Sequence, residues 1–312
     1  MAILTAGCTG GSAPQATPAP VITTAPAPLT TTPATQAPVL TMVTATQAAT
    51  TIPAPTGPYA VQQIAGKLRV TGSTTVLPIA QATADAYMEK NLAADIRIAG
   101  GGSSVGVQAI GEGTADIGMS SREISPAEKT KYPNLVPIEV ATDAVVVIVN
   151  TQNPVSALTL DQVRGLYNGT YQGWNNVGGT NTYPVTIGRD SASGTRVYFS
   201  EAVMKNEKYR PDMREMNSNG AVKQTVAQTP GAIGYVGLGY IDNTVKAVAI
   251  YAKGQPVTPG ITTVLAHQYP ISRPLYMITR GQPAGLAKDY LDFILSDEGQ
   301  KIVSEQGFVP LS

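Results

Sequence analysis

The sequence predicts an α/β fold of two lobes, with mixed and mainly parallel sheets, joined by two crossing strands. Strand-like and helix-like segments alternate from Lys67 onward with turns of only a few residues, a pattern typical of parallel strands. The run AVVVIVN at 144–150 is too uniformly apolar for a half-exposed strand, so we expect it to be buried on both faces. The C-terminal stretch has one strand and two helices that return to the first lobe, which requires a second crossing.

The expected elements follow in chain order. A strand at 68–72 leads into a helix at 76–90, whose apolar residues recur at helical spacing, and a second such unit begins at 95. The remaining elements are a helix through 110, a strand at 115–119, a β-rich stretch at 135–150, a helix at 195–203, a strand at 273–280, a helix at 284–295 and a last helix, capped by Ser296, to 305. We assign 67–147 plus 246–312 to lobe 1 and 148–245 to lobe 2.

The N-terminal part differs in composition from the rest. The first 66 residues contain no Lys, Arg, Asp or Glu, although the chain has 21 basic and 21 acidic residues. Residues 12–58 are nearly all Thr, Ala, Pro, Gln and Val, too poor in large apolar side chains to offset the entropy of an ordered chain. We interpret 12–58 as a disordered linker.

Cys8 is the only cysteine, so an internal disulfide or a cysteine metal site is excluded. The preceding residues, LTAGC at 4–8, resemble a lipobox, although Thr5 takes the place of the usual apolar residue. Only seven residues precede Cys8, fewer than a signal peptide needs, so either the start is truncated or residues 1–11 are not a signal. A lipid anchor at Cys8 is the favoured interpretation, and an ordinary cysteine is the alternative.

Four polar, glycine-rich turns lie where a strand is expected to give way to a helix. They are GSTTV at 72–76 (turn 1), GGGSSVG at 100–106 (turn 2), MSSRE at 119–123 (turn 3) and RDSASGTR at 189–196 (turn 4). Such turns direct backbone N–H groups, hydroxyls and a positive helix end at one small volume, which suits a tetrahedral anion. The candidate ligands are Ser73, Thr74, Thr75, Ser103, Ser104, Ser121, Arg189, Ser193, Gly194 and Thr195.

Each turn also has a simpler interpretation. The hydroxyls could only cap the following helices, and Arg189 could lie on the surface. The recurrence of the pattern favours a shared anion site, in which the planar guanidinium of Arg189 matches two oxygens of a phosphate. We expect Asp190 to pair with Arg189.

Other classes of function have little support in the sequence. His267 is the only histidine and no GxSxG motif occurs, so a Ser/His/Asp triad or a histidine metal site is not expected. Net charge is zero and the basic residues are scattered, which argues against nucleic acid as a partner. We expect no metal, no cofactor and no chemical turnover, with a secreted phosphate-ester hydrolase as the less favoured alternative.

From Lys67 to Ser312 the chain resembles the phosphate-binding proteins of phosphate ABC importers, in the periplasmic-binding-protein superfamily. The resemblance rests on VTGSTTV, GGGSSVG, GTADIGMSSRE, RDSASGT, SNGAV, PGAIGYVGLGY and SRPLYMITRGQP, in that order. It implies a type II, two-lobed fold that closes over one phosphate and passes it to the permease subunits of an ABC importer. It also implies an extracytoplasmic, monomeric protein, attached to the membrane only through a lipid anchor.

The family's phosphate ligands correspond to Thr74, Thr75, Ser103, Arg189, Ser193, Gly194 and Thr195. One departure concerns turn 3, where Ser121 stands in the place of an aspartate that accepts the phosphate proton in well-known members. Asp143, just before the strand that leaves lobe 1, is our candidate for this role, and its structural alternative is capping or pairing with a lysine. Without such a carboxylate, the same fold could instead bind sulfate, molybdate or tungstate.

Overall fold

The computed structural model describes residues 63–311. The linker expected at 12–58 and the candidate anchor Cys8 lie outside the described residues. Within 63–311, no helix is both long and apolar enough to cross a membrane.

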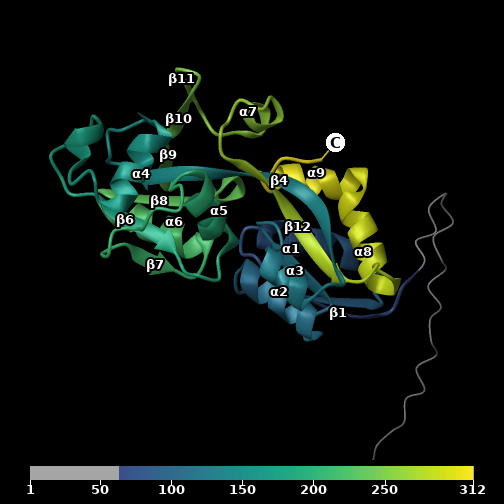
Figure 1. Ribbon diagram of the computed structural model, residues 1–312. Helices are drawn as coiled ribbons and strands as arrows, with labels where there is room; N and C mark the ends of the chain where they lie inside the picture. The colour runs from purple at the N-terminus through teal and green to yellow at the C-terminus, as the bar shows by residue number, and fades with distance from the viewer. Residues whose placement is uncertain (1–62, 312) are drawn as a thin grey trace, which may run out of the picture. The chain divides into compact units, whose positions relative to one another are not determined.

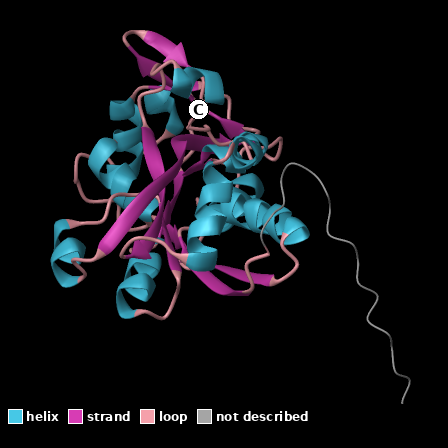
Figure 2. Cartoon of the chain, turned by 90° about the vertical axis from the view of Figure 1, so that its right-hand side faces the viewer, coloured by secondary structure: helices cyan, strands magenta, loops and turns pink. Residues whose placement is uncertain are grey.

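Strands and helices alternate along the described chain, and helices lie on both sides of the strands (Figure 2). The strands are β1 (Gly66–Gly72), β2 (Ala94–Gly100), β3 (Ile117–Ser120), β4 (Leu135–Asn150), β5 (Ala157–Leu158), β6 (Val185–Arg189), β7 (Arg214–Met216), β8 (Ala232–Gly237), β9 (Val245–Ala247), β10 (Ala249–Ala252), β11 (Gln255–Val257) and β12 (Ser272–Arg280). The α-helices are α1 (Leu77–Lys90), α2 (Ser103–Glu112), α3 (Pro126–Lys131), α4 (Leu160–Asn168), α5 (Gly194–Ala202), α6 (Asn219–Gln228), α7 (Ile261–Leu265), α8 (Gly285–Leu295) and α9 (Asp297–Glu305). Two 3-10 helices, η1 (Trp174–Val177) and η2 (Leu238–Tyr240), complete the set.

The predicted helix starts agree with the caps that the structure shows. The Ser193 hydroxyl accepts a hydrogen bond from the Arg196 N–H and caps α5. Ser296 caps α9 in the same way, as the sequence predicted. A capping box of Ser125 and Glu128 begins α3.

The main sheet is mixed. Its strand order is β2-β1-β3-β12-β4-β8-β6-β7, with β9 also paired to β4. The pairs β1–β2, β1–β3, β6–β7 and β6–β8 are parallel, as predicted, whereas β4 and β12 are antiparallel to their neighbours. The sheet is less dominated by parallel pairs than expected, because these two strands run through its middle in opposite directions. A separate small sheet has the order β11-β10-β5.

The long strand β4 connects two hydrophobic cores. Its first part, up to Ala141, packs in the first core with β1, β3, α1, α8 and α9. From Ala144 onward it packs in the second core with α4, α5, α6, β6 and β8. The stretch 144–150 is buried throughout, as predicted for a strand covered on both faces. Figure 1 shows β4 and β12 side by side across the middle of the described chain.

The segment 246–271 packs differently from the sequence-based assignment, which placed it in lobe 1. Val248, Ile250, Val264 and Ile271 are buried in the second core, and the first core resumes only at Leu275. The apolar residues of this segment therefore cover β4 and its neighbours before the chain enters β12.

Candidate anion-binding site

The four polar turns follow the carboxyl ends of parallel strands. Turn 1 follows β1, turn 2 follows β2, turn 3 follows β3 and turn 4 follows β6. The carboxyl ends of parallel strands are the usual ligand-binding edge of an open α/β sheet. The structure brings these turns into contact through the hydrogen bonds described below.

Turns 1 and 4 meet through two threonines that are 120 residues apart in the chain. The hydroxyl oxygens of Thr75 and Thr195 lie 3.0 Å from each other, and both side chains are buried. The hydroxyl of Ser73 accepts a hydrogen bond from the Thr75 N–H (3.2 Å), which holds turn 1 in shape. A hydroxyl that accepts from the protein in this way still has its own hydrogen to donate to an anion.

Turns 2 and 3 meet each other and turn 4. The Ser121 N–H donates to the Ser103 hydroxyl (3.0 Å), and the two hydroxyl oxygens are 3.3 Å apart. A Cβ placed on Gly194 would lie 2.3 Å from the Ser103 Oγ and 2.9 Å from the Ser121 Oγ. Only glycine allows turn 4 to approach this closely. The Ser104 N–H also donates to the carbonyl oxygen of Ala192 in turn 4 (3.1 Å).

Arg189 is buried, with a side chain 1% exposed. Its Nε and Nη2 donate to the carbonyl oxygens of Met216 and Asn217, both at 3.2 Å. The expected pairing with Asp190 is not found, because the Asp190 carboxylate accepts from the Ala192 N–H (3.1 Å) and closes the turn instead. Within 63–311, no carboxylate lies within salt-bridge distance of this guanidinium. Burial lowers the pKa of Arg189, as expected for a cation taken out of water.

Asp143 is completely buried and lies opposite Arg273 in the β4–β12 ladder. The Arg273 Nε and Nη2 donate to the Asp143 Oδ2 (3.2 and 2.9 Å), and the Leu238 N–H donates to Oδ1 (2.9 Å). Burial raises the pKa of Asp143, while Arg273 and the Leu238 N–H act in the opposite direction. Protein donors therefore already occupy both oxygens of this carboxylate.

Asn219 and Arg273 lie at the site although the sequence analysis did not select them. The Asn219 Nδ2 donates to the hydroxyls of Thr74 (3.1 Å) and Thr75 (3.0 Å), and the Arg273 Nη2 donates to the hydroxyl of Thr195 (2.9 Å). For Asn219 a signal was present, because the residues SNG at 218–220 form a further polar turn between a strand and a helix. Arg273 sits within a strand pattern that gives no sign of an inward-facing charge.

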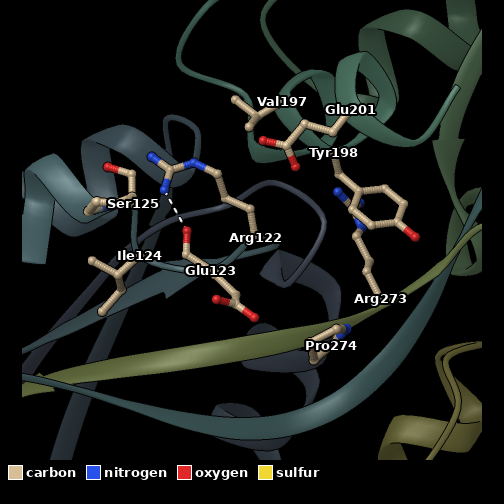
Figure 3. Close-up of a pocket in the computed structure, with 10 residues that line it drawn as sticks. Arg122, Glu123, Ile124, Ser125, Val197, Tyr198, Glu201, Arg273 and Pro274 are labelled. Atoms are coloured by element: carbon tan, nitrogen blue, oxygen red, sulfur yellow. Dashed lines mark hydrogen bonds between the residues drawn. The ribbon is translucent and has the colours of Figure 1, made fainter. Parts of the chain in front are cut away.

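A cavity of about 470 Å³ lies beside these turns (Figure 3). It is lined by the segment after β3, by α5 and by the start of β12, with Arg273 on its wall. The Arg122 Nη1 donates to the Glu123 carbonyl, the dashed line in Figure 3, and Nη2 donates to the Ser104 hydroxyl (3.1 Å). Ser104 is only partly buried, so Arg122 holds its hydroxyl at the edge of the site.

The chain is similar to proteins of known function. A family model described as a PBP superfamily domain matches residues 57–298. The chain is 32% identical over 253 residues to the phosphate-binding protein PstS of Bacillus subtilis strain 168, covering 80% of this chain and 83% of that relative. It is 32% identical over 273 residues to PstS of Pseudomonas aeruginosa PAO1, covering 80% of this chain and 84% of the relative.

Solved structures give the same result. A phosphate-bound crystal structure from Clostridium perfringens, assigned as a phosphate ABC transporter substrate-binding protein, superposes with a TM-score of 0.75 at 33% identity. The match covers 79% of this chain and 100% of that chain. An ABC-type phosphate transport receptor from Vibrio cholerae superposes with a TM-score of 0.65 at 28% identity, covering 78% of this chain and 100% of that chain.

Proposed function

The chain belongs to the PBP superfamily as a PstS-like phosphate-binding protein, and we propose on this basis that its four turns hold one inorganic phosphate for an ABC importer. The relatives are named as binding proteins, and this chain likewise binds its ligand without chemical turnover. The proposed site comprises Ser73, Thr74, Thr75, Ser103, Ser104, Ser121, Arg189, Ser193, Gly194 and Thr195, which contact the phosphate or hold its ligands in place, with Asp143 behind them.

The observation that carries the proposal is the buried guanidinium of Arg189. A buried cation is costly unless an anion or several hydrogen bonds compensate it. Within the described residues, Arg189 has carbonyl partners but no carboxylate partner, and it begins the turn that meets the other three. A phosphate at this position neutralises the guanidinium and accepts from the hydroxyls and N–H groups around it.

The two cores correspond to the two lobes of this proposal. Both β4 and the chain leading into β12 pass from one core to the other, between Ala141 and Ala144 and between Ile271 and Leu275. We place the hinge at these two crossings, so lobe 1 comprises residues up to 142 and from 273 onward, and lobe 2 comprises 143–272. Phosphate binds between turns that belong to different lobes, which links binding to closure.

The protein acts outside the cytoplasm in this proposal, because an importer collects its substrate there. Cys8 carries a lipid that holds the protein at the membrane, and residues 12–58 form the tether to the lobes. Mass spectrometry of the protein purified from membranes tests the anchor: a diacylglyceryl mass on Cys8 supports it, and an unmodified thiol contradicts it.

Sulfate is the second candidate ligand, on one observation. Ser121 occupies the place of the family's proton-accepting aspartate, and both oxygens of Asp143 already accept from protein donors. A site without a free carboxylate lacks the repulsion that excludes a fully deprotonated anion.

Isothermal titration calorimetry of the full chain with phosphate, sulfate and molybdate tests the assignment. We expect one phosphate per chain, bound more tightly than either other anion. Tighter binding of sulfate or molybdate would reassign the ligand, and no binding of any of the three would refute an oxyanion site.

A further inference from the structure

Asn219 has a fixed orientation at the candidate site. The Gly237 N–H lies 3.2 Å from the Asn219 Oδ1, and because a backbone N–H can only donate, this side-chain atom must be the oxygen. The amide nitrogen therefore faces Thr74 and Thr75 and donates one hydrogen to each hydroxyl oxygen. The Asn219 N–H adds a longer contact of 3.4 Å to the Thr74 hydroxyl.

Arg273 donates hydrogen bonds to the hydroxyls of Thr195 and Thr75. Its Nη2 lies 2.9 Å from the Thr195 Oγ1 and 3.4 Å from the Thr75 Oγ1, while the pair with Asp143 holds the guanidinium in place. The Cζ atom of Arg273 lies 5.6 Å from the centre of the Tyr198 ring, beside which it is drawn in Figure 3. Since neither a guanidinium nor the amide nitrogen can accept, the threonine oxygens must accept in all these contacts.

These contacts determine the direction of each hydroxyl hydrogen. A hydroxyl oxygen has two lone pairs and one hydrogen. The Thr75 oxygen accepts from Asn219, and it also accepts at 3.4 Å from the Arg273 hydrogen that is shared with Thr195. Its own hydrogen is therefore directed to the neighbouring Thr195 oxygen at 3.0 Å. The Thr195 oxygen then accepts from both Arg273 and Thr75, and its own hydrogen must be donated elsewhere. The Thr74 oxygen accepts from the side-chain amide and the backbone N–H of Asn219, so its own hydrogen must also be donated to another acceptor.

We propose that Asn219 and Arg273 are positioning residues that commit the hydroxyls of Thr74 and Thr195 to donate to the bound anion. This inference rests on the proposed phosphate site and specifies the form of phosphate that the site takes. A phosphate oxygen that faces a committed donor accepts more strongly when it is unprotonated. The Arg189 guanidinium can also only donate, so it adds a third committed donor to Thr74 and Thr195. The site therefore favours the phosphate dianion, which has three unprotonated oxygens, over the monoanion, which has two.

The charged and titratable groups around these hydroxyls come from five elements. They are Asp143 on β4, Arg273 on β12, Arg189 on β6, Tyr198 on α5 and Tyr240 on η2. The Tyr240 hydroxyl donates to the Thr74 carbonyl, and burial raises the pKa of Tyr198. Burial raises the pKa of Tyr240 to about 12, so this group stays protonated near neutral pH. Sulfate stays fully deprotonated over this pH range, so any change of sulfate binding with pH comes from a protein group such as Asp143. A titration of Asp143 would therefore change the binding of both anions. Sulfate is thus the reference ligand for phosphate-specific protonation.

³¹P NMR of phosphate bound to the full chain tests the proposal, because the chemical shift reports protonation. In the wild type, we expect bound phosphate to keep the dianion shift at a pH where free phosphate is already mostly monoanion. In Asn219→Leu, which keeps the shape of the side chain but removes its donors, the Thr74 and Thr75 hydroxyls can turn and accept. Bound phosphate should then titrate closer to the free ion, and phosphate affinity should fall about tenfold.

Arg273→Lys is the second variant, because it keeps a cation for Asp143 but loses the fork that reaches Thr195. It should shift the ³¹P titration in the same direction, whereas Arg280→Lys, at the exposed end of β12, should match the wild type. Circular dichroism and melting temperature identify any variant that does not fold. A folded Asn219→Leu or Arg273→Lys with a wild-type ³¹P titration, whatever its affinity, would overturn the proposal. Failure of the wild type to bind phosphate would instead overturn the proposed function.

Discussion

Asp143 and Arg273 are register partners in the β4–β12 ladder and form a buried ion pair, 2.9 Å from Oδ2 to Nη2, where both strands pass between the two cores. The same Nη2 also reaches a threonine of turn 4. One guanidinium nitrogen therefore connects the crossing strands to the candidate ligands. Changes to this pair should affect both folding and anion binding.

Asp143→Asn separates these two effects. Removing one partner of a buried ion pair costs about 3 to 5 kcal/mol, and we expect the lower end because the amide oxygen can still accept from Arg273. Urea unfolding measures this loss. The hypothesis that Asp143 accepts the phosphate proton predicts in addition a lower ratio of phosphate to sulfate affinity. An unchanged ratio in a folded variant would leave Asp143 with the ion-pair role alone.

Arg189→Met should weaken binding without weakening the fold. The substitution removes a buried cation that has no carboxylate partner among residues 63–311, so the melting temperature without phosphate should stay the same or rise. Loss of a buried charged contact to the anion should cost roughly 2 to 5 kcal/mol of binding free energy. Calorimetry and thermal unfolding are the two measurements, with Arg97→Met, on the surface, as the control. Unchanged phosphate affinity would show that the site lies elsewhere.

Gly194→Ala tests the contact between turn 4 and turns 2 and 3. The added methyl group would lie 2.3 Å from the Ser103 Oγ, so the turns must separate. We expect at least a tenfold loss of phosphate affinity, about 1.4 kcal/mol. Gly220→Ala is the matched control, because this glycine also lies in the first turn of a helix and a Cβ there meets no atom within 4 Å. Equal affinities of the two variants would contradict close contact of the turns in the phosphate complex.

The sequence was sufficient for most elements and for the four polar turns that the structure brings into contact, because both depend on local chemistry. The buried run 144–150, the strand-to-helix turns and the Ser193 and Ser296 caps can all be inferred from residues close together in the chain. The path of 246–271 could not, because its few apolar residues fit either core and only tertiary packing decides.

The same limit applies to individual site residues. Asp190 is adjacent to Arg189 in sequence, but its carboxylate has a closer backbone donor in the turn. Arg273 reaches the threonines only because β12 pairs with β4, a contact between residues 130 positions apart. No local pattern predicts an ion pair of that separation.

Alkaline pH should destabilise the protein, partly through Tyr240. Burial raises the pKa of Tyr240, and also that of Tyr87, to about 12. An unfolded tyrosine ionises near pH 10, so from about pH 10 to 12 the unfolded state has lost a proton that the folded state keeps. The free energy of unfolding must then fall as pH rises through this window. Urea unfolding at several pH values should give a shallower decline for Tyr240→Phe than for the wild type or for Tyr251→Phe, at an exposed site. Identical slopes would exclude a contribution from Tyr240.

Ser121→Asp should increase discrimination between phosphate and sulfate. The Ser121 hydroxyl is buried and lies 3.3 Å from the Ser103 hydroxyl, which can donate to an introduced carboxylate and hold it in the site. Phosphate keeps a proton that it can donate to this carboxylate, whereas sulfate would place two unprotonated oxygens against each other in a desolvated space. We expect the ratio of phosphate to sulfate affinity, measured by calorimetry, to rise about tenfold or more. Ser121→Asn has the same size without the charge and should leave the ratio near that of the wild type. If the asparagine variant changes the ratio equally, the shape of the side chain rather than its charge controls selectivity at this position. The absence of a carboxylate at residue 121 would then not explain how the site discriminates between phosphate and sulfate.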